Sequence, residues 1–141
     1  MRIEDSCGAL LKQINDELGK RANNAMRPQD VTMTQFSVLM ALRHSSEGEM
    51  PLKELEQSLH VAQSTAVGVV ARLEKKGFIV SLNDPDDKRI KRIRITDAGV
   101  ECCRAAEKNM NQAEEELLAG LTETEREIFR MLLCKVRDSL I

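Results

Sequence analysis

The chain of 141 residues is 42% hydrophobic and 31% charged, with a formal net charge of -2. This length and balance are typical of one soluble globular domain that can bury a sizeable core. No run of about 18 apolar residues is present, so the sequence predicts no membrane-spanning helix. Acidic residues interrupt the amino-terminal segment, which argues against a signal peptide, and we expect a cytoplasmic protein.

The composition also argues against metal, cofactor and enzyme chemistry. The four cysteines, Cys7, Cys102, Cys103 and Cys134, show no CxxC spacing, and the chain has two histidines. No phosphate-binding loop, GxSxG motif or metal-ligand cluster appears, so we expect no enzyme, no metal and no cofactor. In a reducing cytoplasm, all four thiols are expected to be buried or half-buried as small hydrophobic side chains. Because Tyr and Trp are absent, stacking on single-stranded bases has few aromatic side chains to use.

The first part of the chain reads as two helices. Apolar residues recur at the three-to-four spacing of one helix face and predict a first helix that ends near Ala25. These residues are Ile3, Cys7, Leu10, Leu11, Ile14 and Leu18. The segment RPQD at 27–30 breaks this helix. Thr32 and Gln35 have the spacing of a capping box, so a second helix is expected to begin near Met33.

Two shorter helices are expected next. Residues 45–51, SSEGEMP, are rich in helix breakers and predict a loop. A short helix is expected from Pro51, which suits a first helical turn. A turn at 60–61 then leads into a further helix over 63–76, and Gly77 stands where helices favour glycine at their carboxyl end.

The hydrophobic period then changes to two. Residues 78–82 and 91–96 are β-branched and alternating, with a turn-rich segment at 83–90 between them, so a β-hairpin is expected. A long helix begins at Thr96, and a second capping box at 122–125 begins a last helix.

The order of these elements predicts the fold. Helix, short helix, turn, helix and hairpin is the order of a winged helix-turn-helix. We therefore expect a mainly α fold with a small antiparallel β-hairpin, in a single domain of residues 1–141. The winged helix-turn-helix lobe would cover residues 32–96, flanked by long dimerisation helices in residues 1–31 and 97–141. The apolar faces of the first and last helices exceed what such a lobe can cover, so we expect a homodimer.

Basic residues gather in one segment of this acidic chain. The seven residues 88–94 contain five bases and no acid. Residues 60–96 contain eight Lys or Arg and four Asp or Glu, a net charge of +4, which leaves -6 for the rest of the chain. Such a separated charge orients a protein on a polyanion, and double-stranded DNA is the partner that this context favours. The alternative is a hairpin edge that its charges keep from aggregating.

The helix over 63–76 has an outward polar face near its amino end. Its outward residues are Gln63, Ser64, Thr65, Val67 and Gly68, followed by Arg72, and its inward stripe is Ala66, Val69 or Val70, and Leu73. Gln pairs with adenine through two hydrogen bonds, Ser and Thr reach base edges or phosphate, and Val touches a thymine methyl group. We predict that the outward residues contact DNA. The alternative is that they form the solvated face of an amphipathic helix.

The hairpin loop carries the second predicted contact. Asp87 and Arg89 are two residues apart, so the carboxylate can hold the guanidinium extended at the loop tip. An arginine held in this way fits a narrow minor groove, where negative potential is concentrated. Lys88, Lys91 and Arg92 complete the predicted DNA-binding set. The alternative for Asp87 and Arg89 is an exposed ion pair of little energetic value.

Three segments carry a resemblance to a known family. STAVGVVARLEKKGFI at 64–79, DPDDKRIKRIRIT at 84–96 and ITDAG ending in Gly99 resemble the MarR family, the multiple antibiotic resistance regulators. The resemblance covers nearly the whole chain, because the flanking helices also match in number and order. It implies a homodimer with interlocked first and last helices, two DNA-binding lobes and pseudo-palindromic operators. It also implies a repressor that small-molecule ligands or oxidants release from DNA.

The chain departs from the family pattern at three positions. Ala62 stands where a capping Ser is frequent, Gly68 where a basic residue is frequent, and Ile90 where a small residue is usual. A missing side-chain cap at Ala62 would cost about 1 kcal/mol of local helix stability.

Two other functions remain open on the sequence. Cys7 lies near the place where the peroxide-sensing branch of the family carries its reactive thiol, so a cysteine-based redox regulator of the same fold is one alternative. That branch bonds the thiol with tyrosines, which this chain lacks, and packing of Cys7 in the core is the favoured interpretation. A winged helix that binds protein instead of DNA is the other alternative, and it would not need the +4 segment.

Overall fold

The computed structural model describes residues 1–59 and 61–140, so His60 in the predicted turn lies outside the described residues. The helices are α1 (Cys7–Met26), α2 (Met33–Arg43), α3 (Leu52–Leu59), α4 (Gln63–Lys75), α5 (Asp97–Leu117) and α6 (Glu123–Ser139). The strands are β1 (Glu49–Pro51), β2 (Ile79–Asn83) and β3 (Lys91–Ile95). Within the described ranges, none of the helices combines the length and the apolar character needed to cross a membrane.

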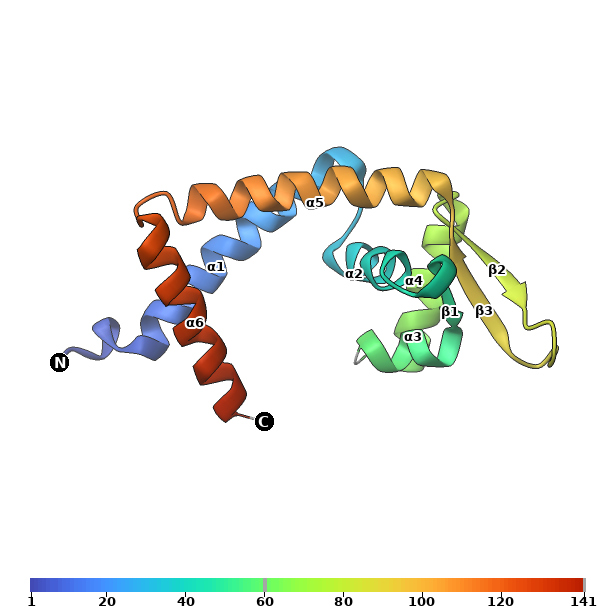
Figure 1. The fold of residues 1–141 in the computed structure, drawn as a ribbon, viewed down its shortest axis with the longest axis horizontal. Coiled ribbons are helices and arrows are strands. Elements are labelled where there is room, and N and C mark those ends of the chain that lie inside the picture. The colour runs from blue at the N-terminus through green and yellow to red at the C-terminus, as the bar shows by residue number, and fades with distance from the viewer. Residues whose placement is uncertain (60, 141) are drawn as a thin grey trace.

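The molecule is elongated, with a lobe at one end and the amino terminus and α6 toward the other (Figure 1). α5 runs along the top of the view from the sheet to the turn before α6, about 30 Å at the usual rise per residue. α1 lies beside α5, whereas α2, α3, α4 and the strands form the lobe. The chain is thus mainly helical with one small sheet, as the sequence predicts.

Local signals set the helix ends. At α2, the Thr32 hydroxyl accepts a hydrogen bond from the Gln35 amide (3.1 Å), and the Gln35 side chain accepts one from the Thr32 amide (3.2 Å). Thr122 and Glu125 exchange the same two bonds at α6. Both predicted capping boxes are therefore confirmed. Thr96 caps α5 in a similar way, with its hydroxyl accepting from a first-turn amide.

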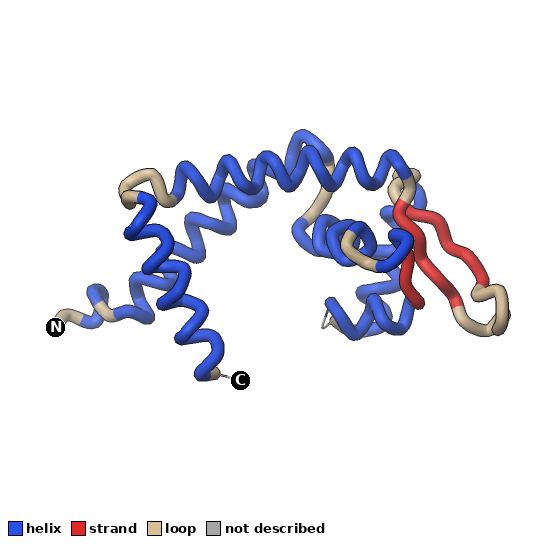
Figure 2. Tube along the Cα trace, in the orientation of Figure 1, coloured by secondary structure: helices blue, strands red, loops and turns tan. Residues whose placement is uncertain are grey.

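The sheet has three strands, one more than the predicted hairpin (Figure 2). The prediction of a loop over 45–51 is wrong at its end, because Glu49–Pro51 forms β1 and pairs antiparallel with β3. The strand order is β1-β3-β2, and Met50 stands opposite Ile93. A strand of three residues is too short to show a hydrophobic period, so its distant partner strand alone identifies it.

The core of the lobe joins all of its elements. The predicted inward stripe of α4 is confirmed, because Ala66, Val69, Val70 and Leu73 are all buried. The other large, fully buried side chains come from α1, α2, α3, α5 and the sheet: Met26, Val38, Leu39, Leu42, Leu55, Ile79, Ile93 and Cys103. Because such cores are close-packed, α4 and the hairpin are held in a fixed relation to each other.

The flanking helices leave much of their apolar surface open. α1 begins at Cys7, and Ile3, which the sequence predicts to lie on its apolar face, belongs to a 3-10 turn before it. Leu10, Leu11 and Ile14 on its predicted apolar face are exposed. α6 buries none of its residues within the chain. Large exposed apolar faces of this kind mark interaction surfaces.

The four cysteines fall into two groups. Cys102 and Cys103 are buried in α5, and Cys134 is half-buried in α6. The prediction that Cys7 packs in the core is wrong for the single chain, because Cys7 is exposed. The reason is the placement of α1, which reaches the core through Ala22 and Met26 in its last turns, far from its first residue.

Candidate nucleic-acid interface

α4 presents polar side chains at its amino end. Gln63, Ser64 and Thr65 are exposed, and Val67 on the following turn is 49% exposed. Ala62 occupies the N-cap position and its side chain makes no hydrogen bond, as the sequence predicts. The first amides of α4 therefore lack a side-chain cap from this residue, and amides at a helix amino end suit a phosphate oxygen.

The rest of α4 is shaped by its packing. Gly68 is half-buried, and a Cβ atom added there would lie 3.5 Å from the Arg72 guanidinium, which is an ordinary contact. Packing thus does not require glycine at this position, and Arg72 is exposed one turn farther on. α4 ends where predicted: Gly77 has a φ of +81°, and the Phe78 amide donates to the Leu73 carbonyl (3.0 Å).

The hairpin of β2 and β3, which we call the wing, holds one arginine outward at its tip. Asp87 Oδ1 accepts from the Arg89 amide (3.0 Å) and from Arg89 Nε (3.1 Å), and Asp87 Oδ2 accepts from Arg89 Nη2 (3.1 Å). These bonds lower the pKa of the Asp87 carboxyl. The Arg89 side chain is nevertheless 90% exposed. The predicted contact between Asp87 and Arg89 is confirmed, and it leaves the guanidinium accessible from outside.

The cations at the base of the wing differ in their partners. Arg92 and Arg94 on β3 both pair with the Glu49 carboxylate on β1, and the Arg92 side chain is only 24% exposed. Lys88 and Lys91 are exposed, and no carboxylate of the described residues lies within 4.0 Å of either ammonium group. The structure therefore gives Arg92, which the sequence predicts to contact DNA, a carboxylate partner inside the protein.

Glu49 is a residue of this site that the sequence did not reveal. Its register partner on β3 is Arg94, 45 residues away in the chain. No local motif joins them, and an acid at the end of a loop carries no signal by itself. The assignment required β1, and β1 exists only as a partner of β3.

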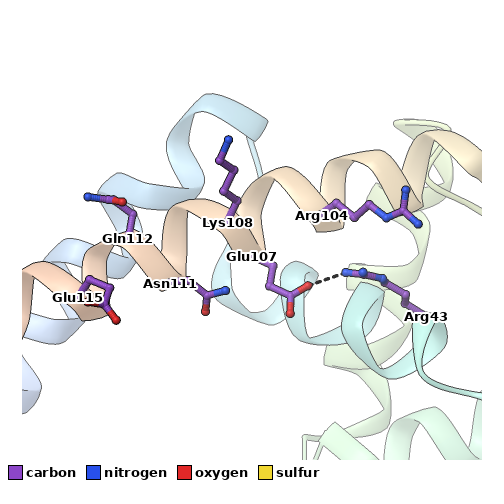
Figure 3. Close-up of a pocket in the computed structure, with 7 residues that line it drawn as sticks. All are labelled: Arg43, Arg104, Glu107, Lys108, Asn111, Gln112 and Glu115. Atoms are coloured by element: carbon purple, nitrogen blue, oxygen red, sulfur yellow. Dashed lines mark hydrogen bonds and ion pairs between the residues drawn. The ribbon is translucent and has the colours of Figure 1, made fainter. Parts of the chain in front are cut away.

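A polar depression of about 440 Å³ lies between the lobe and α5 (Figure 3). It is lined by Arg43 of α2 and by residues of α5: Arg104, Glu107, Lys108, Asn111, Gln112 and Glu115. Glu107 points toward Arg43, and Arg43 Nη1 lies 2.6 Å from Glu107 Oε2. Hydrogen bonds with Cys103 and Glu107 raise the pKa of Arg43, so its guanidinium is charged at neutral pH. Lys108 points away from α2.

Comparison with known proteins identifies the family. A family model described as MarR family matches residues 31–91, from the start of α2 to the wing. The multiple antibiotic resistance protein MarR of Salmonella typhimurium is 32% identical to this chain, over 92% of it and 89% of the relative. The chain belongs to the MarR family.

Solved structures of MarR-family proteins share the whole fold. A mutant MarR from Escherichia coli complexed with operator DNA is 29% identical, with a TM-score of 0.77, covering 92% of this chain and 91% of that one. BpsR of Bordetella bronchiseptica, whose DNA binding is regulated by 6-hydroxynicotinic acid, is 25% identical, with a TM-score of 0.79 and coverage of 98% and 97%. The resemblance predicted from residues 64–79 and 84–96 is thus confirmed. This MarR-family chain is a winged helix-turn-helix transcriptional regulator.

Proposed function

We propose that this MarR-family chain acts in the cytoplasm as a homodimeric, sequence-specific repressor on pseudo-palindromic operator DNA. The observation that carries the proposal is the presence, in one packed lobe, of an exposed polar helix start and an arginine held outward by Asp87. The net charge of +4 over residues 60–96 attracts a polyanion to this lobe. In this proposal α4 enters a major groove and the wing reaches the adjacent minor groove.

In this proposal the exposed residues fall into two groups, those that contact base edges and those that contact phosphates or the minor groove. Base edges are assigned to Gln63, Ser64 and Thr65 at the start of α4, with Val67 against a thymine methyl group and Gly68 allowing close approach. Phosphates are assigned to the exposed cations Arg72, Lys88 and Lys91. Arg89 is assigned to the minor groove, with Asp87 as the residue that orients it. Arg92 leaves the contacting set, since Glu49 already occupies its guanidinium.

A dimer supplies the second lobe that a pseudo-palindrome needs. The exposed apolar faces of α1 and α6 line shared grooves with α5, one of about 600 Å³, which a single chain leaves open. Covering such faces with a second copy would stabilise the assembly through apolar burial. The complex of the related mutant MarR from Escherichia coli with operator DNA supports DNA as the partner.

Selection of bound duplexes from a random pool tests the proposal. We expect an inverted repeat with half-sites about one helical turn apart, because two lobes related by a two-fold axis bind successive major-groove faces. Affinity should also fall steeply as salt concentration rises, since phosphate contacts release counterions. Recovery of no inverted repeat, together with a flat salt dependence, would instead favour a winged helix that binds protein.

A small-molecule effector completes the proposal. In the related BpsR, 6-hydroxynicotinic acid regulates DNA binding. In this chain the depression around Arg43 lies where the lobe meets α5, so a bound molecule there would alter the relation between them. The polar and charged lining suits a small polar anion. Addition of such an acid to the protein–DNA complex is expected to raise the dissociation constant, and Arg43→Ala should abolish that response.

A redox-controlled regulator remains the second candidate, and the exposure of Cys7 favours it. In that case oxidation of the Cys7 thiol would change DNA binding. Thiol titration before and after peroxide, with DNA affinity measured in parallel, separates the two candidates. Loss of one thiol together with loss of DNA binding, both absent in Cys7→Ser, would replace the ligand-controlled proposal.

Recognition of DNA bases by α4 gives a first prediction. Gln63→Ala is expected to cost about 1–3 kcal/mol on the preferred duplex and to relax the choice of base at one position per half-site. Lys91→Ala is expected to weaken binding to all duplexes equally and to flatten the salt slope, because a phosphate contact carries no sequence information. Repeating the duplex selection with both variants checks this. An unchanged motif for Gln63→Ala and a changed one for Lys91→Ala would reverse the two roles.

The wing gives a second prediction. Arg89→Ala is expected to weaken DNA binding by about tenfold or more, because each half-site loses the arginine proposed to enter the minor groove. Lys108→Ala is the control, since Lys108 lies on α5 and points away from the lobe. It removes the same charge and should change affinity by less than about twofold. Fluorescence titrations measure both, and equal losses would mean that the wing does not contact DNA.

A further inference from the structure

Glu49 on β1 forms ion pairs with both arginines of β3, the central strand of the sheet. Glu49 Oε1 accepts from Arg92 Nε (3.1 Å), while Glu49 Oε2 accepts from Arg94 Nε (2.7 Å) and lies 2.6 Å from Arg94 Nη2. The Glu49 side chain is only 13% exposed. The hydrogen bond from Arg94 lowers the pKa of Glu49, so its carboxylate is charged at neutral pH. β1 is therefore tied to β3 by side chains as well as by the strand pairing.

The contacts continue from β3 to the start of the wing loop. Arg92 Nη1 lies 3.6 Å from Asp84 Oδ2, so this guanidinium bridges two carboxylates. Asp84 Oδ1 in turn accepts from the amides of Asp86 (2.9 Å) and Asp87 (3.2 Å). The amide of Asp84 donates to the Ile90 carbonyl (2.9 Å). Asp84 thus fixes the path of the loop on both sides of its tip.

The last link is the pair already described at the tip. The backbone of Asp87, held by Asp84, carries the carboxylate that accepts two side-chain hydrogen bonds from Arg89. An unbroken series of contacts therefore leads from Glu49 on β1 to Arg89, through Arg92, Asp84 and Asp87. Charged groups linked in this way strengthen one another and act as a unit.

We propose that Glu49 is a positioning residue for DNA binding, which holds Arg89 in its extended orientation through Arg92, Asp84 and Asp87. The inference rests on the proposed DNA-binding function and adds to it a residue that touches no DNA. The long side chain of a free arginine loses rotamer entropy when it enters a groove, and orientation before binding reduces that loss. A two-stranded hairpin is weak by itself, so β1 supplies the fixed support that the wing needs.

The proposal predicts that removal of the Glu49 charge weakens DNA binding, whereas simple electrostatics predicts tighter binding. Removal of an acid from a DNA-binding lobe raises its positive charge, which by itself strengthens binding. Glu49→Gln should instead weaken binding, because the released Arg92 no longer holds Asp84 and the wing tip. Asp86→Asn is the matched control, since it makes the same change of charge at an exposed wing residue whose carboxylate accepts no hydrogen bond from a residue in the described ranges.

The experiment is a double-mutant cycle with the duplex recovered by selection, labelled with a fluorophore. We expect Glu49→Gln to raise the dissociation constant about threefold or more, whereas Asp86→Asn leaves it unchanged or lowers it. In an Arg89→Ala background, Glu49→Gln should change affinity by less than about twofold, because the residue through which it acts is absent. Arg92→Lys, which keeps the charge but cannot bridge both carboxylates, should reproduce the loss if Glu49→Gln does not fold.

Several outcomes would overturn the proposal. Tighter DNA binding by Glu49→Gln would show that net charge alone governs the affinity. An equal loss of affinity in the unmodified and the Arg89→Ala backgrounds would show that Glu49 has a general structural role. Hydrogen exchange at Arg89 Nε, measured by NMR without DNA, provides a readout that is independent of the proposed function. We expect faster exchange in Glu49→Gln, and unchanged exchange would refute the positioning role. Another outcome is that Arg89→Ala leaves DNA affinity unchanged while Glu49→Gln speeds hydrogen exchange at Arg89 Nε. That result would refute the DNA contact of the wing, and with it the role of Glu49 in DNA binding, although Glu49 would still orient Arg89.

Discussion

Leu132→Glu on α6 is expected to convert the protein from a dimer into a monomer. Leu132 is 53% exposed in the single chain and lines the apolar groove formed with α1 and α5. In a homodimer the interface would receive a buried charge without a partner from each copy, which costs several kcal/mol, so the dimer dissociation constant should rise about 100-fold or more. Sedimentation at micromolar concentration measures the mass. DNA affinity should fall as well, because a monomer binds half-sites one at a time.

Asp138→Lys provides the control for this variant. Asp138 lies on the same helix, its side chain is 64% exposed, and its carboxylate pairs with the adjacent Arg137. The change alters the charge of α6 without placing it on the apolar face, so a dimer and normal DNA binding are expected. A dimeric mass for Leu132→Glu, or a monomeric mass for the unmodified chain at micromolar concentration, would show that the apolar faces of α1 and α6 do not join two copies.

Gly99→Ala is expected to destabilise the fold by about 3 kcal/mol, as overpacking of a tight contact does. Gly99 lies in the first turn of α5, where a Cβ atom would overlap the backbone carbonyl of Phe78 and lie 2.7 Å from the Ile95 side chain. The carbonyl cannot move freely, because it accepts a hydrogen bond from the Thr96 amide (3.0 Å). Thermal or denaturant unfolding followed by circular dichroism measures the loss.

Gly120→Ala is the matched control for Gly99→Ala. Gly120 lies in the turn before α6, and a Cβ atom added there meets nothing within 4 Å. Its effect on stability should stay within about 0.5 kcal/mol, as for most exposed substitutions. Equal unfolding midpoints for the two variants would mean that α5 does not pack tightly against the turn between α4 and β2.

Much of the architecture follows from short-range sequence signals. The spacing of Thr32 with Gln35, and of Thr122 with Glu125, predicted two helix starts that the structure confirms by hydrogen bonds. The sequence also predicted the apolar stripe of α4 and the glycine that follows the helix, and the structure confirms both. Asp87 and Arg89, two residues apart, also met as predicted. Capping, helical period and turn chemistry involve residues within about one helical turn of each other, so the sequence by itself contains them.

Only the tertiary structure decided the features that depend on distant partners. β1 became a strand because β3 lies beside it, and Glu49 thereby met Arg92 in an ion pair within the protein. Cys7 became exposed because α1 reaches the core only in its last turns. The sequence determined which faces are apolar and which segment is basic. It could not determine which faces stay uncovered, because burial depends on how helices far apart in the chain pack in space.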